Sequence, residues 1–574
     1  MTHEVADARR SQLVSTYGVG SLFPAGDESF MICGLDDWPI DPWAVEISEP
    51  RLARSLGVMT FRPPPSGRRD GDVPVVRFPD YHFCTQCRAL KRRQQFCNDR
   101  SSYCRTCGRR ITPSRFVACC PRGHIEDFPF HQWVHAGSGA AGGEHNLTLS
   151  SQGRSSSLAD IIIGCSCGVP SVSMDNSFRP TALKGIAKCH GRRPWLADAD
   201  EDGCQETLRA LQRGSSNVWF PEVRSAISIP PWSDRAHQLA RRHWAVFKNA
   251  NDATLREALA DMDLARQGLS VEMMLEAVAQ LRGDGTDDDP YTDERLRREE
   301  YQALTTGHPE TSSRDQFVAV PVAINGELAI APVLEQVSTV SRLREVRALA
   351  SFSRITPWSP GTDEAYRGAI TAGQPVWLPA MEVLGEGIFL RFDSGALADW
   401  EAAKFAHDRA QLVCDGMALH GNMFGRRADA TVSPRELLLH SFAHVLLNEL
   451  SLDAGYPAAS LRERLYAGPD EAGVLIYTAS ADSAGSLGGL AAQSAAARFD
   501  AVVRSAIRRA RWCTADPVCI EATSSGAGGV NLAACHACLL LPETSCERYN
   551  SVLDRATLVG VPEEPEAGFF SALS

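Results

Sequence analysis

The chain has 574 residues, of which 44% are hydrophobic and 22% are charged, so its composition is that of a globular protein and excludes collagen-like, coiled-coil and wholly disordered classes. Its formal net charge of -12 excludes a uniformly basic nucleic-acid-binding surface but leaves room for a local basic face. The polar start and the lack of an uninterrupted apolar run of about 18 residues predict a cytoplasmic protein with no signal peptide and no membrane partner.

In chain order, the sequence predicts a multidomain α+β protein with five regions. Residues 1–80 alternate short apolar runs with Gly and Pro, which indicates a β-rich N-terminal domain. Residues 81–215 hold most of the cysteines and predict two zinc-ribbon-like modules, and residues 216–315 show the periodicity of a helical connector. Residues 316–430 mix strand-like and helical segments and predict a mixed α/β middle domain. Residues 431–574 predict a mixed α/β C-terminal domain with a cysteine zinc cluster.

Eighteen cysteines in a chain without a predicted signal peptide favour metal ligation over disulfides, because the cytosol keeps thiols reduced. The first group consists of Cys84-x2-Cys87 and, after sixteen intervening residues, Cys104-x2-Cys107. Each Cys-x2-Cys pair forms a turn that places two sulfurs on one side, so this spacing predicts a zinc ribbon with four sulfur ligands. Cys97, which lies between the pairs, is an alternative ligand.

A second cysteine group follows the apolar segment 161–163. Cys165 and Cys167 lie beside glycines that allow the backbone to approach a metal closely, and Cys189 and Cys204 follow at wider spacing. We expect these four residues to form a second zinc site. The alternative interpretation is that they are small hydrophobic side chains packed in a core.

A third group near the end of the chain contains Cys535-x2-Cys538 and then Cys546. Either Cys519 or Cys513 can supply the fourth ligand, and we prefer Cys519. All three predicted sites have four protein sulfurs and therefore lack the open position that metal catalysis requires. The sequence thus predicts about three structural Zn(II) ions per chain.

Histidines lie close to the cysteines in the segment between the first two groups. Cys120, His124, His131 and His135 are all present there, so a fourth metal site is conceivable. The aromatic residues between them, such as Phe128, make ordinary aromatic packing the better interpretation.

A second histidine pair lies on a predicted helix near residue 440. Ser433 is expected to cap this helix and Pro434 to occupy its first turn. His440 and His444 share one helix face four residues apart, which is compatible with metal binding. Because leucines and valines flank both of them, we interpret the pair as buried histidines with hydrogen-bond partners.

Signatures of catalysis are absent from the sequence. Gly does not precede any of the five lysines, which excludes a phosphate-binding P-loop, and no HExxH zinc-protease pattern occurs. We therefore predict no catalytic residues.

Basic residues gather around the first cysteine group, where residues 88–115 contain nine Lys or Arg and one acid. Arginine matches phosphate oxygens with paired hydrogen bonds, and Phe96 and Tyr103 can stack on bases, so this basic strip is the predicted DNA-binding surface. The alternative is a solvated face. The predicted contacts are Arg88, Lys91, Arg92, Arg93, Arg105, Arg109 and Arg110.

Several longer segments resemble a known family. They are RRSQLVSTYGVGSLF, RFVACCPRGHIEDFPF, GEGIFLRF, LIYTASADSAGSLGGL and CHACLLLPETSCERYNSVLDR. Together they resemble the DrmB family of the DISARM antiphage defence system over nearly the whole chain. The last 140 residues resemble the helicase-associated zinc-binding domain of mitomycin-repair helicases, whose cysteine cluster corresponds here to Cys519, Cys535, Cys538 and Cys546. Because five cysteines occur in this region, the fourth ligand stays open.

The resemblance implies a bacterial protein that pairs with a separate helicase-like ATPase, DrmA, to engage invading DNA. Our leading hypothesis is a noncatalytic zinc-binding subunit that partners a DrmA-like helicase and contributes DNA binding. One alternative is a metal-dependent nuclease or hydrolase that uses His440 and His444, with the Gly-rich segment 485–489 holding a phosphate. The other is a purely structural assembly factor without DNA contact.

Overall fold

The computed structural model divides the described residues into two compact units, each built from several chain segments. Unit 1 comprises Met1–Ile47, Val58–Arg224 and Arg347–Met381, and unit 2 comprises Ser48–Gly57, Ser225–Val346 and Glu382–Ser574. The structure describes residues 5–40, 46–67, 71–97, 102–136, 145–153, 157–199, 203–283, 291–312, 314–358, 363–423, 431–478, 488–526 and 529–573. Most of the Gly-rich segment 485–489 lies outside these ranges.

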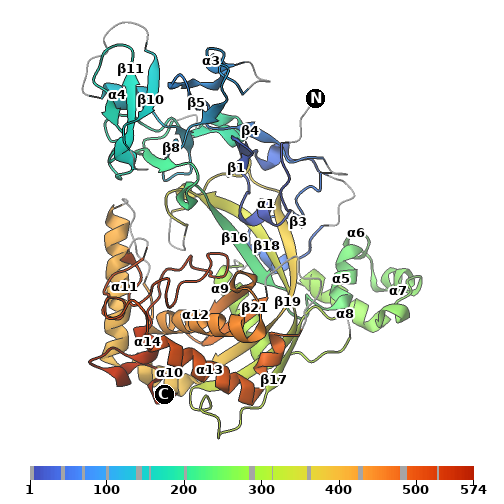
Figure 1. Cartoon of the computed structure of the whole chain (residues 1–574). Helices are drawn as coiled ribbons and strands as arrows, with labels where there is room; N and C mark the ends of the chain where they lie inside the picture. The colour runs from blue at the N-terminus through green and yellow to red at the C-terminus, as the bar shows by residue number, and fades with distance from the viewer. Residues whose placement is uncertain are drawn as a thin grey trace. The chain divides into compact units, whose positions relative to one another are not determined.

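Unit 1 is rich in short strands, which confirms the β-rich N-terminal region predicted from the sequence (Figure 1). One sheet has the order β1-β2-β4, with β1 (Leu22–Ala25), β2 (Glu28–Ile32) and β4 (Val75–Arg77). A six-stranded sheet has the order β12 (Val172–Ser173), β11 (Ile161–Cys165), β10 (Leu147–Ser151), β6 (Ala89–Arg92), β5 (Tyr81–Cys84) and β7 (Ile111–Pro113). A third sheet has the order β15 (Arg209–Gln212), β8 (Phe116–Cys119) and β9 (Ile125–Asp127). The remaining elements of this unit are α1 (Gln12–Ser15), β3 (Thr60–Arg62), α3 (Arg93–Phe96), α4 (Phe130–His135), β13 (Arg192–Arg193) and β14 (Asp198–Ala199).

Strand β8, the middle strand of its sheet, lies in an apolar core. All four residues of β8 are buried, as expected for a strand covered on both faces. Phe116 packs against Phe128 and Phe130, and the ring centroids of the latter two lie 4.9 Å apart. This aromatic core holds the start of α4, so the aromatic packing predicted for the segment is present.

Arg354 connects three distant segments of unit 1 through its buried guanidinium group. It donates hydrogen bonds to the carbonyl oxygens of Gly123, Val218 and Gly20 at 2.7, 2.6 and 2.8 Å. Burial lowers the pKa of Arg354 to about 10. Because the group is still far from neutral at physiological pH, its charge strengthens these bonds.

Most residues of a sheet with the order β16-β18-β19-β21-β20, to which β17 adds by pairing with β18, belong to unit 2. The start of β16, the end of β18 and the start of β19 belong to unit 1. The strands are β16 (Phe220–Ile227), β17 (Val318–Val322), β18 (Leu334–Ser353), β19 (Trp377–Phe392), β20 (Leu461–Tyr466) and β21 (Gly473–Thr478). Strands β19 and β21 pair antiparallel, with Ile388 opposite Ile476. Strand β21 is buried at all six positions, because helices and other elements cover both of its faces.

Helices of the C-terminal part pack on this sheet and share one large apolar core with it (Figure 1). They are α10 (Ser394–Glu401), α11 (Lys404–Met423), α12 (Pro434–Ala454), α13 (Ala496–Ala510) and α14 (Ala556–Val559). Helix α12 begins as predicted, since the Ser433 hydroxyl accepts a hydrogen bond from the Glu436 N–H at 3.1 Å and Pro434 occupies the first turn. Between Leu437 and Leu450 every residue of α12 except Asn448 is buried, so the polar side chains of this stretch need partners inside the core.

Helices fill the middle of the chain, as the sequence predicted. They are α5 (Arg235–Arg242), α6 (Trp244–Phe247), α7 (Asp252–Ala260), α8 (Val271–Gly283) and α9 (Asp293–Thr306). Helix α2 (Pro50–Ser55) lies much earlier in the chain but also belongs to unit 2. Helices α5 to α8 have an apolar core of their own and form the green helical lobe in Figure 1. Helix α9 is tied to the sheet by Glu300, which receives two hydrogen bonds of 2.7 Å from Arg464 on β20. Among the described helices, none combines the length and the apolar character needed to span a bilayer.

Candidate metal centres

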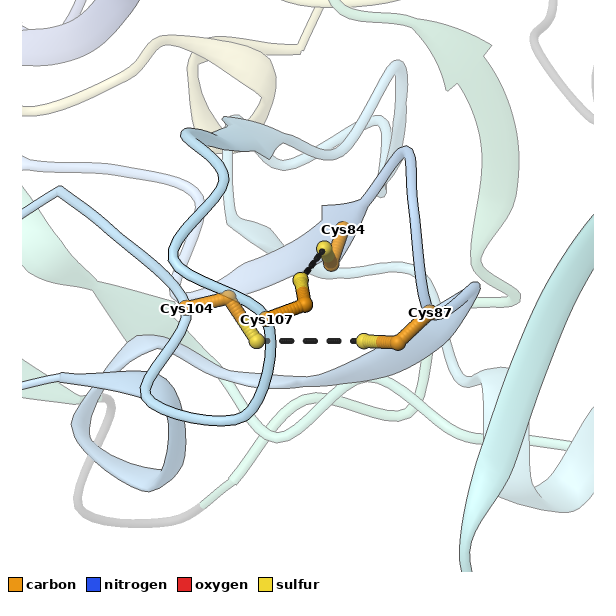
Figure 2. Close-up of side chains that lie close together, drawn as sticks. All are labelled: Cys84, Cys87, Cys104 and Cys107. Atoms are coloured by element: carbon orange, nitrogen blue, oxygen red, sulfur yellow. Dashed lines mark hydrogen bonds between the residues drawn. The ribbon is translucent and has the colours of Figure 1, made fainter.

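The four cysteines of the first predicted group lie together in unit 1, and we call them the ribbon cluster (Figure 2). Cys84 ends β5, Cys87 lies in the turn before β6, and Cys104 and Cys107 belong to a second turn. The Sγ atoms of Cys84 and Cys107 are 3.2 Å apart, and those of Cys87 and Cys104 are 3.8 Å apart. A tetrahedral zinc site with Zn–S distances of about 2.3 Å has S–S edges of about 3.8 Å. The Cys87–Cys104 distance equals this edge and the Cys84–Cys107 distance is shorter, and all four sulfurs lie within 4.8 Å of one another, close enough to share one ion.

Both turns of the ribbon cluster have the same backbone construction. The Arg88 N–H donates to the Cys84 carbonyl at 2.9 Å, and the Gly108 N–H donates to the Cys104 carbonyl at 2.8 Å. Arg88 and Gly108 both have positive φ, which turns the chain sharply after each second cysteine. Burial opposes ionisation of the Cys104 thiol, but backbone N–H groups of Cys107 and Thr106 outweigh it and lower the pKa to about 6.

Cys97 lies outside the ribbon cluster. It is buried, and its thiol faces the Arg93 carbonyl oxygen at 3.7 Å on α3. The cluster therefore has its four donors without Cys97.

The structure does not bring the four cysteines of the second predicted group together. It places Cys189 and Cys204 with Cys120 and His124, in what we call the three-cysteine cluster. It places Cys165 and Cys167 with two histidines instead. The sequence interpretation failed here because sequence spacing does not show which turns face each other across the strands.

The three-cysteine cluster is entirely buried beside the third sheet of unit 1. Antiparallel pairing of β8 with β15 brings the chain before β15 close to the end of β8. The Cys120 Sγ therefore lies 3.9 Å from the Cys204 Sγ and 3.2 Å from the His124 Nδ1, which is 3.6 Å from the Cys189 Sγ. The adjacent Cys119 is not part of the cluster, and burial raises its pKa to about 12.

The other half of the second group forms what we call the two-histidine cluster, with His135, His145, Cys165 and Cys167. The His135 Nε2 lies 3.3 Å from the Cys167 Sγ, and the His145 Nδ1 lies 3.5 Å from the Cys165 Sγ. Helix α4 presents His135 and β11 ends at Cys165. A backbone N–H of Val169, together with His135, lowers the pKa of the Cys167 thiol to about 6. The His135 ring stacks on His131, which agrees with the packing predicted for it, and it also faces three potential ligands that the sequence interpretation did not group with it.

The third predicted group also has a different membership. The structure gathers Cys513, Cys519, Cys535 and Cys538, which we call the C-terminal cysteine cluster. The Sγ atoms of Cys513 and Cys535 are 3.5 Å apart, and those of Cys519 and Cys538 are 3.7 Å apart. Both candidates for the fourth ligand therefore belong to the cluster, and Cys546 does not.

Cys546 lies instead with His440, His444 and Glu463, and we call these residues the mixed-ligand cluster. The two histidines come from α12 and Glu463 from β20, and all four side chains are buried. The sequence interpretation recognised buried histidines with hydrogen-bond partners but missed the grouping, because Glu463 and Cys546 are remote in sequence. The hydrophobic sequence of α12 does not indicate that Glu463 and Cys546 lie beside its histidines.

The structure also changes the membership of the basic strip. Arg93 is buried, with 6% of its surface exposed, and it cannot reach a DNA phosphate. Lys91 lies over the Phe96 ring at 4.7 Å, and Phe96 is only 1% exposed, so this ring cannot stack on a base. The Phe96 assignment fails because α3 turns the ring into the small apolar core of the ribbon cluster, and the Arg93 assignment fails because this side chain is buried at the start of α3.

Among the predicted DNA contacts of the basic strip, the exposed arginines are Arg88, Arg92, Arg105, Arg109 and Arg110, and Arg115 at the end of the strip is exposed as well. Arg92 and Arg110 form exposed ion pairs with Asp80 and Asp27, with N–O distances of 3.7 and 3.0 Å. Tyr103 is 55% exposed beside them. Residues 98–101 lie outside the described residues.

Comparisons with known proteins support the resemblance drawn from the sequence motifs. Residues 442–539 match the MrfA Zn-binding domain, and residues 9–220 match a domain of unknown function, DUF8724. The chain is 29% identical over 554 residues to the DISARM protein DrmB of Bacillus paralicheniformis. The aligned region covers 92% of this chain and 96% of that protein. The similarity to DrmB over nearly the whole length and the MrfA-type zinc-binding segment confirm the resemblance.

Proposed function

We propose that this chain is a noncatalytic, zinc-stabilised subunit of a DISARM-type antiphage defence assembly, in which it partners a DrmA-like helicase and contributes a DNA-contacting surface. Its similarity to a DISARM protein supports the assignment to such an assembly. In this role the zinc ions hold the binding surfaces in place, and the helicase partner hydrolyses ATP.

The observation that carries the proposal is the set of clusters in which four protein donors converge on one point. The ribbon, three-cysteine, two-histidine and C-terminal cysteine clusters each offer four ligand atoms that lie within 4.8 Å of one another. Four protein ligands complete a tetrahedral zinc shell and leave no position for a water or substrate. We therefore assign four structural zinc ions to these clusters, in place of the two N-terminal ions and one C-terminal ion inferred from sequence spacing.

The hydrolase alternative has weaker support than this proposal. A hydrolytic metal needs an open position for its water, whereas His440 and His444 are completely buried and share their centre with two further donors. A nuclease assay with Mg(II) or Mn(II) tests this alternative directly. DNA cleavage by the purified chain that disappears in the His440→Ala variant would favour the hydrolase.

DNA contact is assigned to the basic strip in its revised form. The five predicted contacts that are exposed, Arg88, Arg92, Arg105, Arg109 and Arg110, lie around the ribbon cluster, and Tyr103 offers an exposed ring for stacking on a base. None of these features selects a base sequence, so binding is expected to depend on the phosphate backbone.

The proposal is tested by purifying the chain with and without its helicase partner. We expect the two proteins to copurify, the chain alone to lack ATPase activity, and the pair to hydrolyse ATP faster when DNA is added. The chain alone is expected to lack ATPase activity because it has no P-loop lysine. ATP hydrolysis by a preparation shown by mass spectrometry to be free of helicase would contradict the noncatalytic role. Copurification without any DNA dependence or DNA binding would favour the purely structural assembly factor.

A further inference from the structure

The mixed-ligand cluster is buried inside unit 2, where polar groups are costly unless they are paired. His440 and His444 lie on the same face of α12, Glu463 extends from the middle of β20, and Cys546 lies in the segment after the C-terminal cysteine cluster. The side chains of both histidines and Glu463 are 0% exposed. Water therefore does not solvate this group of donors.

Hydrogen bonds fix the protonation of both imidazole rings. The His440 Nδ1 lies 3.0 Å from the Val552 carbonyl oxygen, and the His444 Nδ1 lies 2.8 Å from the Leu539 carbonyl oxygen. A carbonyl oxygen can only accept, so each Nδ1 carries a proton and donates it. Metal-binding histidines typically make this bond, because it points the lone pair of Nε2 at the metal.

Both Nε2 atoms face the carboxylate of Glu463. The His440 Nε2 is 3.1 Å from Oε1, and the His444 Nε2 is 3.5 Å from Oε2. The His444 Nε2 and the Glu463 Oε2 are buried without a hydrogen-bond partner among the described residues. Two acceptors that face each other in a dry core require a cation between them.

The sulfur of Cys546 completes the arrangement. It lies 3.2 Å from the His440 Nε2 and accepts hydrogen bonds of 3.3 Å from the backbone N–H groups of Arg548 and Asn550. Burial and the Glu463 carboxylate raise the pKa of the Cys546 thiol, so the two N–H donors alone do not hold a thiolate there, and a cation is needed beside the sulfur for the charged form. Similar N–H donors reach sulfurs of other clusters, such as the Ala515 N–H on the Cys513 Sγ at 3.4 Å.

Protons on the imidazoles and a divalent metal ion are the two kinds of cation that could fill the centre. One protonated imidazole would balance the carboxylate, but it would leave the second Nε2 facing a carboxylate oxygen with no proton between them, so both imidazoles would have to be protonated. If both imidazoles were protonated, two positive rings would be buried against one carboxylate and a neutral thiol, with a net charge of +1. A divalent metal ion with one carboxylate, one thiolate and two neutral imidazoles is neutral overall. An uncompensated charge in a buried site carries a large free-energy penalty. The neutral arrangement with the divalent ion is therefore favoured over two protonated imidazoles.

We propose that His440, His444, Glu463 and Cys546 bind one further zinc ion, in a closed structural site that is separate from the C-terminal cysteine cluster. Tetrahedral zinc with Zn–N and Zn–S distances of about 2.0 and 2.3 Å places such ligand atoms roughly 3.3–3.6 Å apart, close to the spacings observed. The ion joins α12, β20 and the segment after the C-terminal cysteine cluster. His440 and Cys546 lie outside residues 442–539, the segment that matches the MrfA Zn-binding domain.

Metal counting by native mass spectrometry of the full chain tests this site. We expect five zinc ions in the parent protein and four in Glu463→Gln, which keeps the size of the side chain but removes its charge. Glu449→Gln is the matched control, because it also removes a buried carboxylate from this region, one that pairs with Arg509 on α13. The control is expected to keep all five ions. A parent protein that holds four ions and loses none in Glu463→Gln would overturn the proposal.

Anomalous X-ray scattering across the zinc absorption edge gives a test that needs no variant, in case Glu463→Gln fails to fold. Crystals of the unmodified chain are expected to show a zinc peak between the four side chains. Peaks at the four cysteine-rich clusters without one here would refute this site and leave the proposed function intact. Missing peaks at those clusters would count against the proposed function instead.

Discussion

Replacing Arg105 and Arg109 by glutamine tests whether the basic strip contacts DNA phosphates. Both side chains are exposed next to the ribbon cluster. Each phosphate contact that is lost lowers the slope of log affinity against log salt by about 0.9 on duplex DNA or about 0.7 on single strands. Two lost contacts therefore reduce the duplex slope by about 1.8. The ratio of parental to variant affinity then shrinks about 12-fold between roughly 50 and 200 mM salt.

The assay is fluorescence anisotropy with labelled DNA of several sequences at a series of salt concentrations, with the chain alone and with its helicase partner. Arg256→Gln with Arg266→Gln is the matched control, because it removes the same charge from exposed positions of the helical lobe. We expect the strip variant to lose affinity equally for all sequences and the control to keep the parental slope. Parental affinity and slope in the strip variant would show that DNA binds elsewhere. An equal change in the control would show that only net charge matters.

Three further predictions concern stability and metal content. Cys535→Ser is expected to lose one zinc ion and to destabilise the C-terminal domain. Cys414→Ser is the control, because Cys414 lies outside every cluster found among the described residues, and it is expected to keep the full metal content. Elemental analysis measures the zinc content of the two variants, and calorimetry measures their stability. Burial raises the pKa of the Asp127 carboxyl to about 6. The folded state then binds this proton more tightly than the unfolded state, so stability falls as pH rises from about 4 to about 6. Across that pH window the free energy of unfolding of Asp127→Asn should rise by up to about 2.7 kcal/mol relative to that of the parent, because the variant has no carboxyl to ionise. Equal pH profiles of thermal unfolding for the two proteins would contradict this. Arg464→Met leaves Glu300 buried without its ion-pair partner and should cost about 3–5 kcal/mol, while the double variant with Glu300→Gln costs less. Hydrogen exchange of β20 measures this, and equal losses in the two variants would refute the pairing argument.

The sequence predicted the fold class and the ribbon cluster because both depend on local patterns. Cys84 and Cys87 lie on one turn and Cys104 and Cys107 on another, so short spacing determines which sulfurs meet. The β-rich start and the helical middle follow from local periodicity in the same way.

The remaining clusters could not be predicted from spacing, because tertiary packing assembles them. Cys120 and Cys204 are 84 residues apart and meet because β8 pairs with β15. Cys546 follows Cys538 closely but lies against α12, where its sulfur meets His440 at a different centre. The burial of Arg93 likewise depends on the turn from β6 into α3, which charge counting does not show.

The three carbonyl bonds of Arg354 have a consequence for the order of events during synthesis. Arg354 is 231 residues beyond Gly123, yet both belong to unit 1. At about 5–20 residues per second, the ribosome delivers Arg354 about 12–46 s after Gly123. During that time the N-terminal segments of unit 1, including the turn of the three-cysteine cluster, are already synthesised, but their carbonyl oxygens lack the hydrogen bonds that Arg354 donates in the folded protein. A fragment that ends at residue 224 contains every ligand of the three N-terminal clusters but lacks Arg354, so it is expected to be prone to aggregation even when zinc is abundant.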